Sequence, residues 1–358
     1  MTLPRREFHQ SLGARFTTVS GAEVVADYGG PLAEHRALRE TAGVLDLSFR
    51  SRLCLLGADR VRFLHGQVTN DVKKLRPGEG CYAALTTAKG KMQSDLHVFV
   101  LPDEILLDFE PGYAASVSQR LEKFIVADEV QVVDVAPLYG LLSVQGPRAR
   151  GLEAFVDWPD QPFGSVKFSD ATLGEIYVIN HARLGSIGFD LFVPCNSMVA
   201  VAEVLISASS AIGGRAVGWN AFEIARIEAG VPRFGADMDE TNLPPECGIE
   251  ARAVSYTKGC YIGQEALNRI HSLGHVNRQL CGLRLADDLK ALPERGAKLL
   301  HEGKEVGHVT SAIHSPALQA NLALGYVRRE ANAAGHELTV AGGGELIRAR
   351  LVELPFRA

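Results

Sequence analysis

The strongest chemical feature of this sequence is a cysteine held in a short glycine-containing segment. Cys260 lies in the run Lys258 to Glu265, which reads Lys-Gly-Cys-Tyr-Ile-Gly-Gln-Glu. A helix is expected to begin at Glu265, so Gly263 falls at the turn into it, where a residue without a Cβ takes backbone angles that others avoid. A thiol ahead of a helix N-terminus and near the Lys258 ammonium is expected to have a lowered pKa and to react as a thiolate. The spacing fits equally well a small buried cysteine in a tight turn.

Composition limits the classes of protein to which the chain can belong. Its 358 residues, 46% of them hydrophobic, are enough for two or three domains. The net charge of -5 argues against general nucleic-acid binding, so we expect no direct DNA binding. The six cysteines are scattered without a C-x-x-C pair, which favours a reducing compartment. There is no secretory h-region and no apolar run of about 18 residues, so we expect a cytoplasmic protein without membrane contact.

Motifs for nucleotide hydrolysis, dinucleotide redox chemistry and zincin chemistry are missing from the sequence. His271 and His275 have the spacing of a helical metal-ligand pair. Gly274 interrupts the helix that they would need, so we expect no metal site.

The order of apolar patterns predicts an α+β protein in three parts. In residues 1–137, alternating apolar residues predict three strands between residues 81 and 109, followed by a helix. A similar order of strands and helices returns in residues 138–273, which we interpret as the second unit of a tandem, ferredoxin-like repeat. Short strands with glycine-rich turns predict a β-barrel in residues 278–358.

The segment around Cys260 resembles the signature of the YgfZ family. These are folate-binding proteins that support assembly or repair of iron–sulfur enzymes, including enzymes that modify tRNA. The family is a branch of the glycine cleavage T-protein superfamily, whose aminomethyltransferases usually have aspartate where Cys260 stands. The stretch 63–72 also resembles the YgfZ pattern, and the superfamily resemblance covers nearly the whole chain. It implies a tandem ferredoxin-like folate-binding region of T-protein type with a C-terminal β-barrel domain.

The resemblance also implies that the chain binds tetrahydrofolate or a derivative. The run 226–235 resembles the superfamily's Arg-x-Glu-Ala-Gly helix and the aromatic-Gly that follows it. Carried over, Arg226 and Phe234 become folate contacts, with Glu228 beside them. By periodicity alone, the arginine and the glutamate would be surface charges on a helix. The other candidates for the folate pocket are Tyr82, Asp108 and Gln264.

A carboxylate is expected where the one-carbon unit is transferred. In aminomethyltransferases a strand after a Gly-Gly turn carries two adjacent carboxylates, one of which interacts with the folate. The matching run 90–96 has Ser94-Asp95 in their place, so Asp95 is the expected catalytic carboxylate. The run 183–190 keeps the superfamily's Gly-Phe-acid but lacks the glutamate that holds the pterin edge. Both departures disfavour an aminomethyltransferase.

We therefore expect a folate-binding protein that supports iron–sulfur enzymes, with Cys260 as its functional thiol and Lys258 and Asp95 in the reactive site. Its expected partners are iron–sulfur client or assembly proteins. The alternative is an aminomethyltransferase that works with a lipoyl carrier protein, and a degenerate folate demethylase is a third hypothesis. The sequence leaves open whether the protein turns over a substrate.

Overall fold

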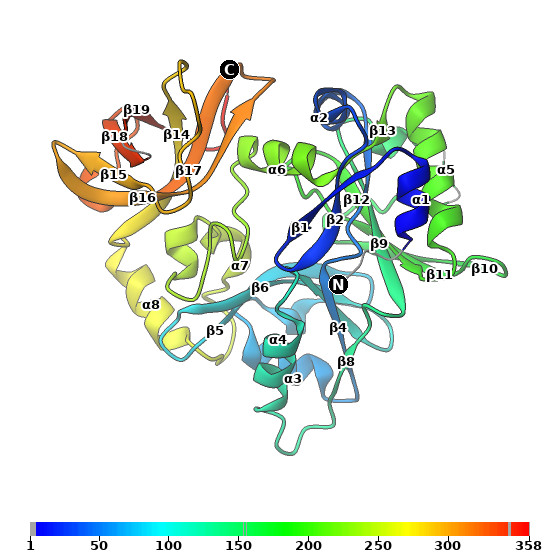
Figure 1. Cartoon of the computed structure of the whole chain (residues 1–358). Coiled ribbons are helices and arrows are strands. Elements are labelled where there is room, and N and C mark those ends of the chain that lie inside the picture. The colour runs from blue at the N-terminus through cyan, green and yellow to red at the C-terminus, as the bar shows by residue number, and fades with distance from the viewer. Residues whose placement is uncertain (1–4, 153, 155, 343–344, 358) are drawn as a thin grey trace.

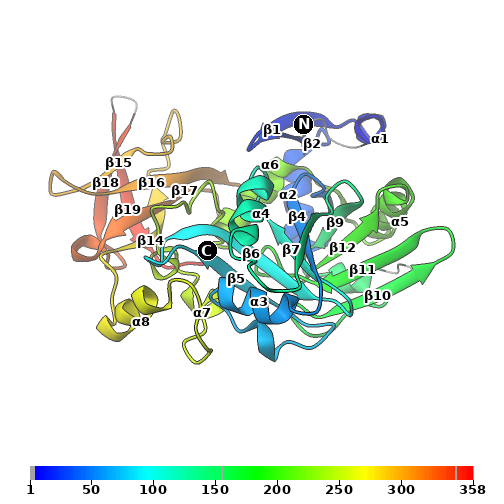
Figure 2. The ribbon, with the colours of Figure 1, turned by 90° about the horizontal axis from the view of Figure 1, so that it is seen from below.

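The computed structural model of the chain describes residues 5–152, 154, 156–342 and 345–357. Two open β-sheets pack against each other, each with helices on its outer face, and a closed β-barrel follows at the C-terminal end (Figure 1). The view from below shows the barrel beside the two-sheet body (Figure 2). The predicted α+β class with a C-terminal barrel is confirmed.

The first sheet is antiparallel; its outer face is apolar, and its inner face is partly apolar and partly polar. Its strand order is β5 (Gly80–Thr86), β6 (Met92–Val100), β7 (Ile105–Phe109), β4 (Ser51–Leu56) and β8 (Gln131–Asp134). Its outer face is covered by two helices, α3 (Arg60–Gln67) and α4 (Ala114–Glu122). Along β6, Leu96 and Val98 join the core beneath these helices, whereas Asp95 and His97 line a cavity on the opposite face. The alternation is that of a strand with two different environments.

The second sheet packs its inner face on the first. Its strand order is β10 (Ser165–Asp170), β11 (Gly174–Asn180), β12 (Gly188–Pro194), β9 (Tyr139–Gln145), β3 (Gly43–Asp46) and β13 (Arg215–Ala216). Helix α5 (Met198–Ala211) covers its outer face, where Val201 and Leu205 pack with Val144. On the inner face, Phe192 of β12 lies 6.1 Å from Phe99 of β6 between ring centroids. The two sheets therefore share one core.

The N-terminal segment crosses from one sheet to the other. Strand β3 precedes the first sheet in sequence but pairs with β9 and β13 of the second. The elements that precede β3 in the sequence are α1 (Arg6–Ser11), β1 (Arg15–Val19), β2 (Ala22–Asp27) and α2 (Pro31–Glu40). Helix α6 (Trp219–Glu228) packs against α2. The division into units 1–137, 138–273 and 278–358 stays a prediction.

The barrel is attached to α6 by buried hydrogen bonds. Its strands close in the order β14 (Arg278–Leu285), β17 (Ala320–Arg328), β16 (Lys304–Ser315), β15 (Lys298–His301), β18 (Glu337–Gly342) and β19 (Glu345–Val352). Ser315 of β16 donates a hydrogen bond of 2.5 Å to Glu228 of α6, and Thr310 donates one of 2.7 Å to Asp237. The polar residues at this junction are therefore paired rather than free.

Short helices complete the chain. They are α7 (Glu250–Ala253), α8 (Gln264–Leu273) and the 3₁₀ helices Val72–Lys74, Ala149–Gly151, Pro244–Cys247 and Arg329–Ala331. Within the described ranges, no helix is long and apolar enough to cross a membrane. The cytoplasmic location stays a prediction.

Candidate functional site

A cavity of about 440 Å³ lies where the polar part of the first sheet's inner face meets the loops at the edge of the second sheet. Its walls come from the first sheet, from the loops before β10 and after β11 of the second, and from α6 with the segment that follows it. The side chains that line it include Arg50, Tyr82, Asp95, His97, Glu110, Phe163, His181, Arg183 and Arg252. A volume of this order is typical of sites for small organic ligands.

One row of polar residues runs across the first sheet on the cavity side. Tyr82 of β5 is paired in register with His97 of β6, which is paired in turn with Asp108 of β7. Asp108 is paired with Arg52 of β4. Because register partners on antiparallel strands point to the same face, the four side chains share that face, together with Asp95 two residues before His97.

Asp95 is a buried carboxylate with one unsatisfied oxygen. Only 8% of its surface is exposed. The Tyr82 hydroxyl donates a hydrogen bond of 2.8 Å to Oδ2, and Oδ1 has no hydrogen-bond partner among the described residues. Burial, and then the charge of Glu110, raises the pKa of Asp95 to about 6. An N–H group of a ligand would satisfy the free oxygen.

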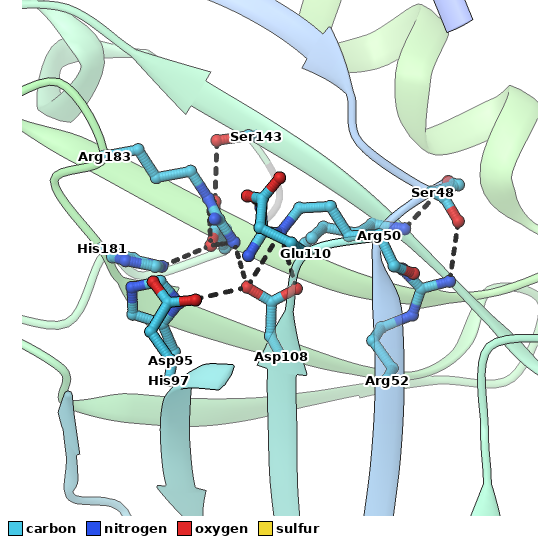
Figure 3. A network of polar contacts seen from close by, with 12 residues as sticks. Ser48, Arg50, Arg52, Asp95, His97, Asp108, Glu110, Ser143, His181 and Arg183 are labelled. Carbon is cyan, nitrogen blue, oxygen red and sulfur yellow. Dashed lines mark hydrogen bonds and ion pairs between the residues drawn. The ribbon is translucent and has the colours of Figure 1, made fainter. Parts of the chain in front are cut away.

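Behind the cavity, buried ion pairs join the two sheets, with Arg183 and Arg50 on either side of Asp108 (Figure 3). Asp108 accepts hydrogen bonds from Arg50 Nε at 2.9 Å and from Arg183 Nη2 at 2.8 Å. Arg183 Nε also donates to Asp190 of β12 at 2.9 Å. Burial alone would raise the pKa of Asp108, but the two guanidiniums hold it well below its usual range. Asp108 is thus an ionised carboxylate that holds Arg50 and Arg183 in place, and it does not line the cavity.

Arg226 lines the cavity, but its guanidinium is engaged within the protein. It donates to Asp237 Oδ2 at 2.6 Å and to the Val231 carbonyl at 3.0 Å. It also forms an ion pair with Glu223. Arg226, the predicted folate contact, is therefore part of the cavity wall, and its positive charge is already neutralised by carboxylates of the protein.

The two other residues predicted from the same run lie outside the cavity. Glu228 accepts hydrogen bonds from Ser315 and, at 3.0 Å, pairs with His35 Nε2, so it connects α2, α6 and the barrel. Phe234 is 1% exposed and packs edge-on against Tyr113, with ring centroids 5.0 Å apart. Both side chains are absent from the cavity lining.

Lys258 binds the end of α3 rather than the neighbouring thiol. Its buried ammonium donates hydrogen bonds to the carbonyls of Val68 at 2.7 Å, of Asn70 at 2.8 Å and of His65. Burial lowers the pKa of Lys258 to about 8. Three carbonyls therefore hold this cation, and it pins the loop that carries Cys260.

The rest of this segment also lies away from the cavity. Cys260 is exposed and Gln264 begins α8, and neither lines the cavity. Gly263 has φ 94°, in the left-handed region. A Cβ there would lie 2.6 Å from Thr86 Oγ1 and 2.7 Å from the Thr87 carbonyl oxygen, so the turn into α8 needs glycine.

The two histidines that resemble a metal-ligand pair are engaged elsewhere. His271 stacks on Tyr256 with ring centroids 3.8 Å apart, and His275 Nδ1 lies 2.9 Å from the Leu273 carbonyl oxygen. In the part of the chain that the structure describes, no group of three His, Cys, Asp or Glu side chains is placed to hold a metal ion.

Several cavity residues were not predicted. His97 carried a usable signal, since a polar residue two positions from Asp95 in an apolar strand must share its face. Phe163 carried none, because its φ of 58° is unusual for an aromatic residue and is set by tertiary structure. Arg252 lies over the Tyr82 ring at 5.2 Å. Its position depends on the path that the chain takes after the second sheet, so no local pattern indicated it.

Comparisons with known proteins identify the same architecture. The GCVT N-terminal domain matches residues 6–258, and the glycine cleavage T-protein C-terminal barrel domain matches residues 278–357. Relatives named aminomethyltransferase include one from Nostoc sp., 30% identical over 99% of this chain and 96% of the relative, and one from Shouchella clausii, 29% identical with the same shares. The crystal structure of the glycine cleavage system aminomethyltransferase T from Bartonella henselae has a TM-score of 0.89 and 26% identity, and the match covers 100% of this chain and 98% of that one.

These matches correct the function preferred from the sequence. The T-protein superfamily is confirmed, but the relatives and the solved structure are named aminomethyltransferase, and none of these matches is specific to YgfZ proteins. Iron–sulfur clients, cluster assembly and tRNA modification are likewise unsupported. The physical reason for the error is that Cys260 lies on an exposed loop outside the cavity, so its identity says little about what the cavity binds.

Proposed function

We propose that this chain, which belongs to the glycine cleavage T-protein family, is an aminomethyltransferase that transfers a one-carbon unit to tetrahydrofolate bound between its two sheets. Asp95 carries the proposal: it is a buried carboxylate with one free oxygen, in the wall of a ligand-sized cavity. The full-length similarity to proteins named aminomethyltransferase supports the same function.

The residues of the cavity fit a reduced folate. A pterin is flat and carries N–H groups along its edge, so it needs aromatic side chains at its faces and acceptors at its rim. Tyr82 and Phe163 supply aromatic rings, and Asp95 Oδ1 supplies an acceptor that no described residue uses. Arg252 is exposed at the cavity and has no carboxylate partner among the described residues, so it would bind the glutamate tail.

The chain's own groups would hold the reacting centre in place. Tetrahydrofolate, when bound, would supply the nitrogen that accepts the one-carbon unit. Asp95 would orient that amine and stabilise positive charge as it develops. The Tyr82 hydroxyl occupies Oδ2 of Asp95 and leaves Oδ1 for the ligand. Burial raises the pKa of Asp95, and the negative charge of Glu110, which is held by Arg50 and by Arg233 at 2.9 Å, raises it further.

The other residues predicted from the sequence are proposed to act indirectly. Asp108 and Arg226 would fix the cavity walls through their ion pairs. Glu228 and Phe234 would do so through their contacts around α6 and the following loop. The Lys258 loop, with Gln264 at its end, would brace the end of α3 against α8.

We propose a lipoyl carrier protein as the partner that delivers the one-carbon unit. The reaction needs a donor of the one-carbon unit. The cavity residues described here provide hydrogen-bond acceptors and groups that position a ligand, and none of them is a source of carbon. The exposed Arg252 marks the side of the cavity that is open to solvent.

The test is a glycine-cleavage assay with the carrier protein, combined with calorimetric binding of tetrahydrofolate. Asp95→Asn is expected to lower kcat by about 100-fold or more, because it removes the charge on a positioned carboxylate. Cys260→Ala is expected to leave turnover unchanged. Wild-type protein that does not bind tetrahydrofolate, or turnover that survives Asp95→Asn and collapses on Cys260→Ala, would refute the proposal.

A further inference from the structure

Two histidines line the cavity beside Asp95, and each turns Nδ1 towards a buried carboxylate. His181 Nδ1 is hydrogen-bonded to Asp190 Oδ2 at 2.7 Å, whereas His97 Nδ1 lies 3.4 Å from Asp108 Oδ2 and has no hydrogen-bond partner among the described residues. Neither Nε2 makes a hydrogen bond to a residue that the structure describes. The two rings are 4.2 Å apart between centroids; His97 lies on β6 of the first sheet, and His181 follows β11 of the second (Figure 3).

The carboxylates behind these rings fix where each imidazole carries its proton. Asp108 and Asp190 are both held ionised by Arg183, and an ionised carboxylate only accepts hydrogen bonds. The His181 ring therefore places its N–H at Nδ1, in its hydrogen bond to Asp190. For His97 the same tautomer is favoured electrostatically, because the ionised Asp108 carboxylate lies on the Nδ1 side of the ring. Burial, and then His181, lowers the pKa of His97 to about 3, and burial lowers the pKa of His181, so both rings are neutral at physiological pH. A neutral ring protonated at Nδ1 is an acceptor at Nε2.

The donors on the same wall are already engaged. Arg50 is paired with Asp108 and Glu110, and Arg183 with Asp108 and Asp190. The Tyr82 hydroxyl donates to Asp95, as described above. Next to the two histidines and Asp95, what is left for a ligand is therefore a set of acceptors, whereas the donors still available in the cavity are those of Arg252, over the Tyr82 ring, and Arg233 Nε.

We propose that His97 and His181 are ligand-positioning residues whose two Nε2 acceptors, with Asp95 Oδ1, bind the N–H-bearing edge of the pterin ring. The inference rests on the proposed function and extends it to the chemistry by which the ring is recognised. Three acceptors on one wall favour a planar heterocycle with several N–H donors and disfavour one whose edge carries carbonyls alone.

Phe163 keeps the two rings in place. Its ring lies 5.3 Å from that of His181 and 6.2 Å from that of His97, and its plane is within 27° of the His97 plane. Its backbone φ of 58° is in the left-handed region, which is strained for an aromatic residue. Such strain persists where the surrounding structure requires it. Here the strained backbone places the Phe163 ring beside the two histidine rings.

The test measures binding to the full chain by calorimetry, with tetrahydrofolate and with p-aminobenzoyl-glutamate, which has the tail but no pterin. His97→Phe keeps an aromatic ring and removes the acceptor, so it is expected to raise the Kd for tetrahydrofolate about tenfold. The Kd for the tail fragment is expected to change less than about twofold. His97→Gln, which restores an acceptor, is expected to recover most of the loss. His275→Phe, an exposed histidine outside the cavity, is the matched control and is expected to bind both ligands as wild type does.

A second measurement on wild type does not depend on the folding of a variant. Two-bond ¹H–¹⁵N spectra of the histidine rings are expected to show His97 and His181 as neutral Nδ1–H tautomers. Protonation at Nε2, equal weakening of tetrahydrofolate and the tail fragment by His97→Phe, or no weakening of either, would overturn the inference. Wild-type protein that fails to bind tetrahydrofolate would overturn the proposed function as well, whereas binding that is indifferent to His97→Phe would overturn this inference alone.

Discussion

Replacing Asp95 by asparagine is expected to make the protein more stable at neutral pH while it slows transfer. The pKa of Asp95 is raised from 3.8 to about 6 by burial and then by Glu110, so the ionised form is disfavoured in the folded state. At about 1.4 kcal/mol per pKa unit, the shift corresponds to a destabilisation of about 3 kcal/mol above pH 7. Asparagine removes the charge and keeps an acceptor for the Tyr82 hydroxyl. We therefore expect a gain of about 2–3 kcal/mol in the free energy of unfolding at pH 7.5.

The pH dependence of this gain has a definite sign. Between pH 6 and pH 4 the folded protein binds a proton at Asp95 that the unfolded chain does not, so wild-type stability rises relative to the variant as the pH falls. The gain is expected to shrink to about 1 kcal/mol at pH 4.5.

Urea unfolding of both proteins at pH 7.5 and pH 4.5 measures the gain at each pH, with Asp103→Asn as the control at an exposed carboxylate. A variant less stable than wild type at pH 7.5, or a gain of equal size at both pH values, would refute the electrostatic argument for the site.

The other predictions concern the loop around Cys260. Gly263→Ala is expected to lower Tm by several degrees more than Gly274→Ala, since both glycines have positive φ but only a Cβ at Gly263 meets Thr86; equal losses would contradict the clash. Lys258→Met is expected to destabilise the protein by about 2–3 kcal/mol in urea, because three buried carbonyls lose their donor, and an unchanged midpoint would show that the cation is dispensable. Cys260→Ala is expected to change neither Tm nor tetrahydrofolate affinity, because the thiol is exposed and outside the cavity. Weaker binding of tetrahydrofolate by this variant would show that the thiol does contribute to the binding site.

Local sequence patterns were sufficient for the fold class but not for the way the two sheets are built. Period-two alternation marked the strands of residues 81–109, and glycine-rich turns marked the barrel, because both are properties of short segments. The pairing of β3 with β9 joins residues about a hundred positions apart, and nothing in either strand alone specifies it. That pairing places a segment from the start of the chain in the second sheet.

The candidate site was predicted in part, and the missing part has a physical cause. Asp95 was selected because a run of sequence around it resembles a known pattern, and it lines the cavity. His97 was missed although it shares a strand face with Asp95, and the histidine pair also requires His181 from the other sheet. Cys260 was given too much weight, because a reactive residue type was taken for a reactive position.

The geometry of the cavity is set before a ligand arrives. Arg183 binds Asp108 of the first sheet and Asp190 of the second, with all three side chains buried. Breaking a buried ion pair of this kind typically removes about 3–5 kcal/mol, whereas a single ligand hydrogen bond contributes about 0.5–1.5 kcal/mol. One hydrogen bond to a ligand could not offset the loss of one of these pairs. The acceptors of His97 and Asp95 are therefore held at fixed positions, and a ring whose donors match them loses little free energy to reorganisation when it binds.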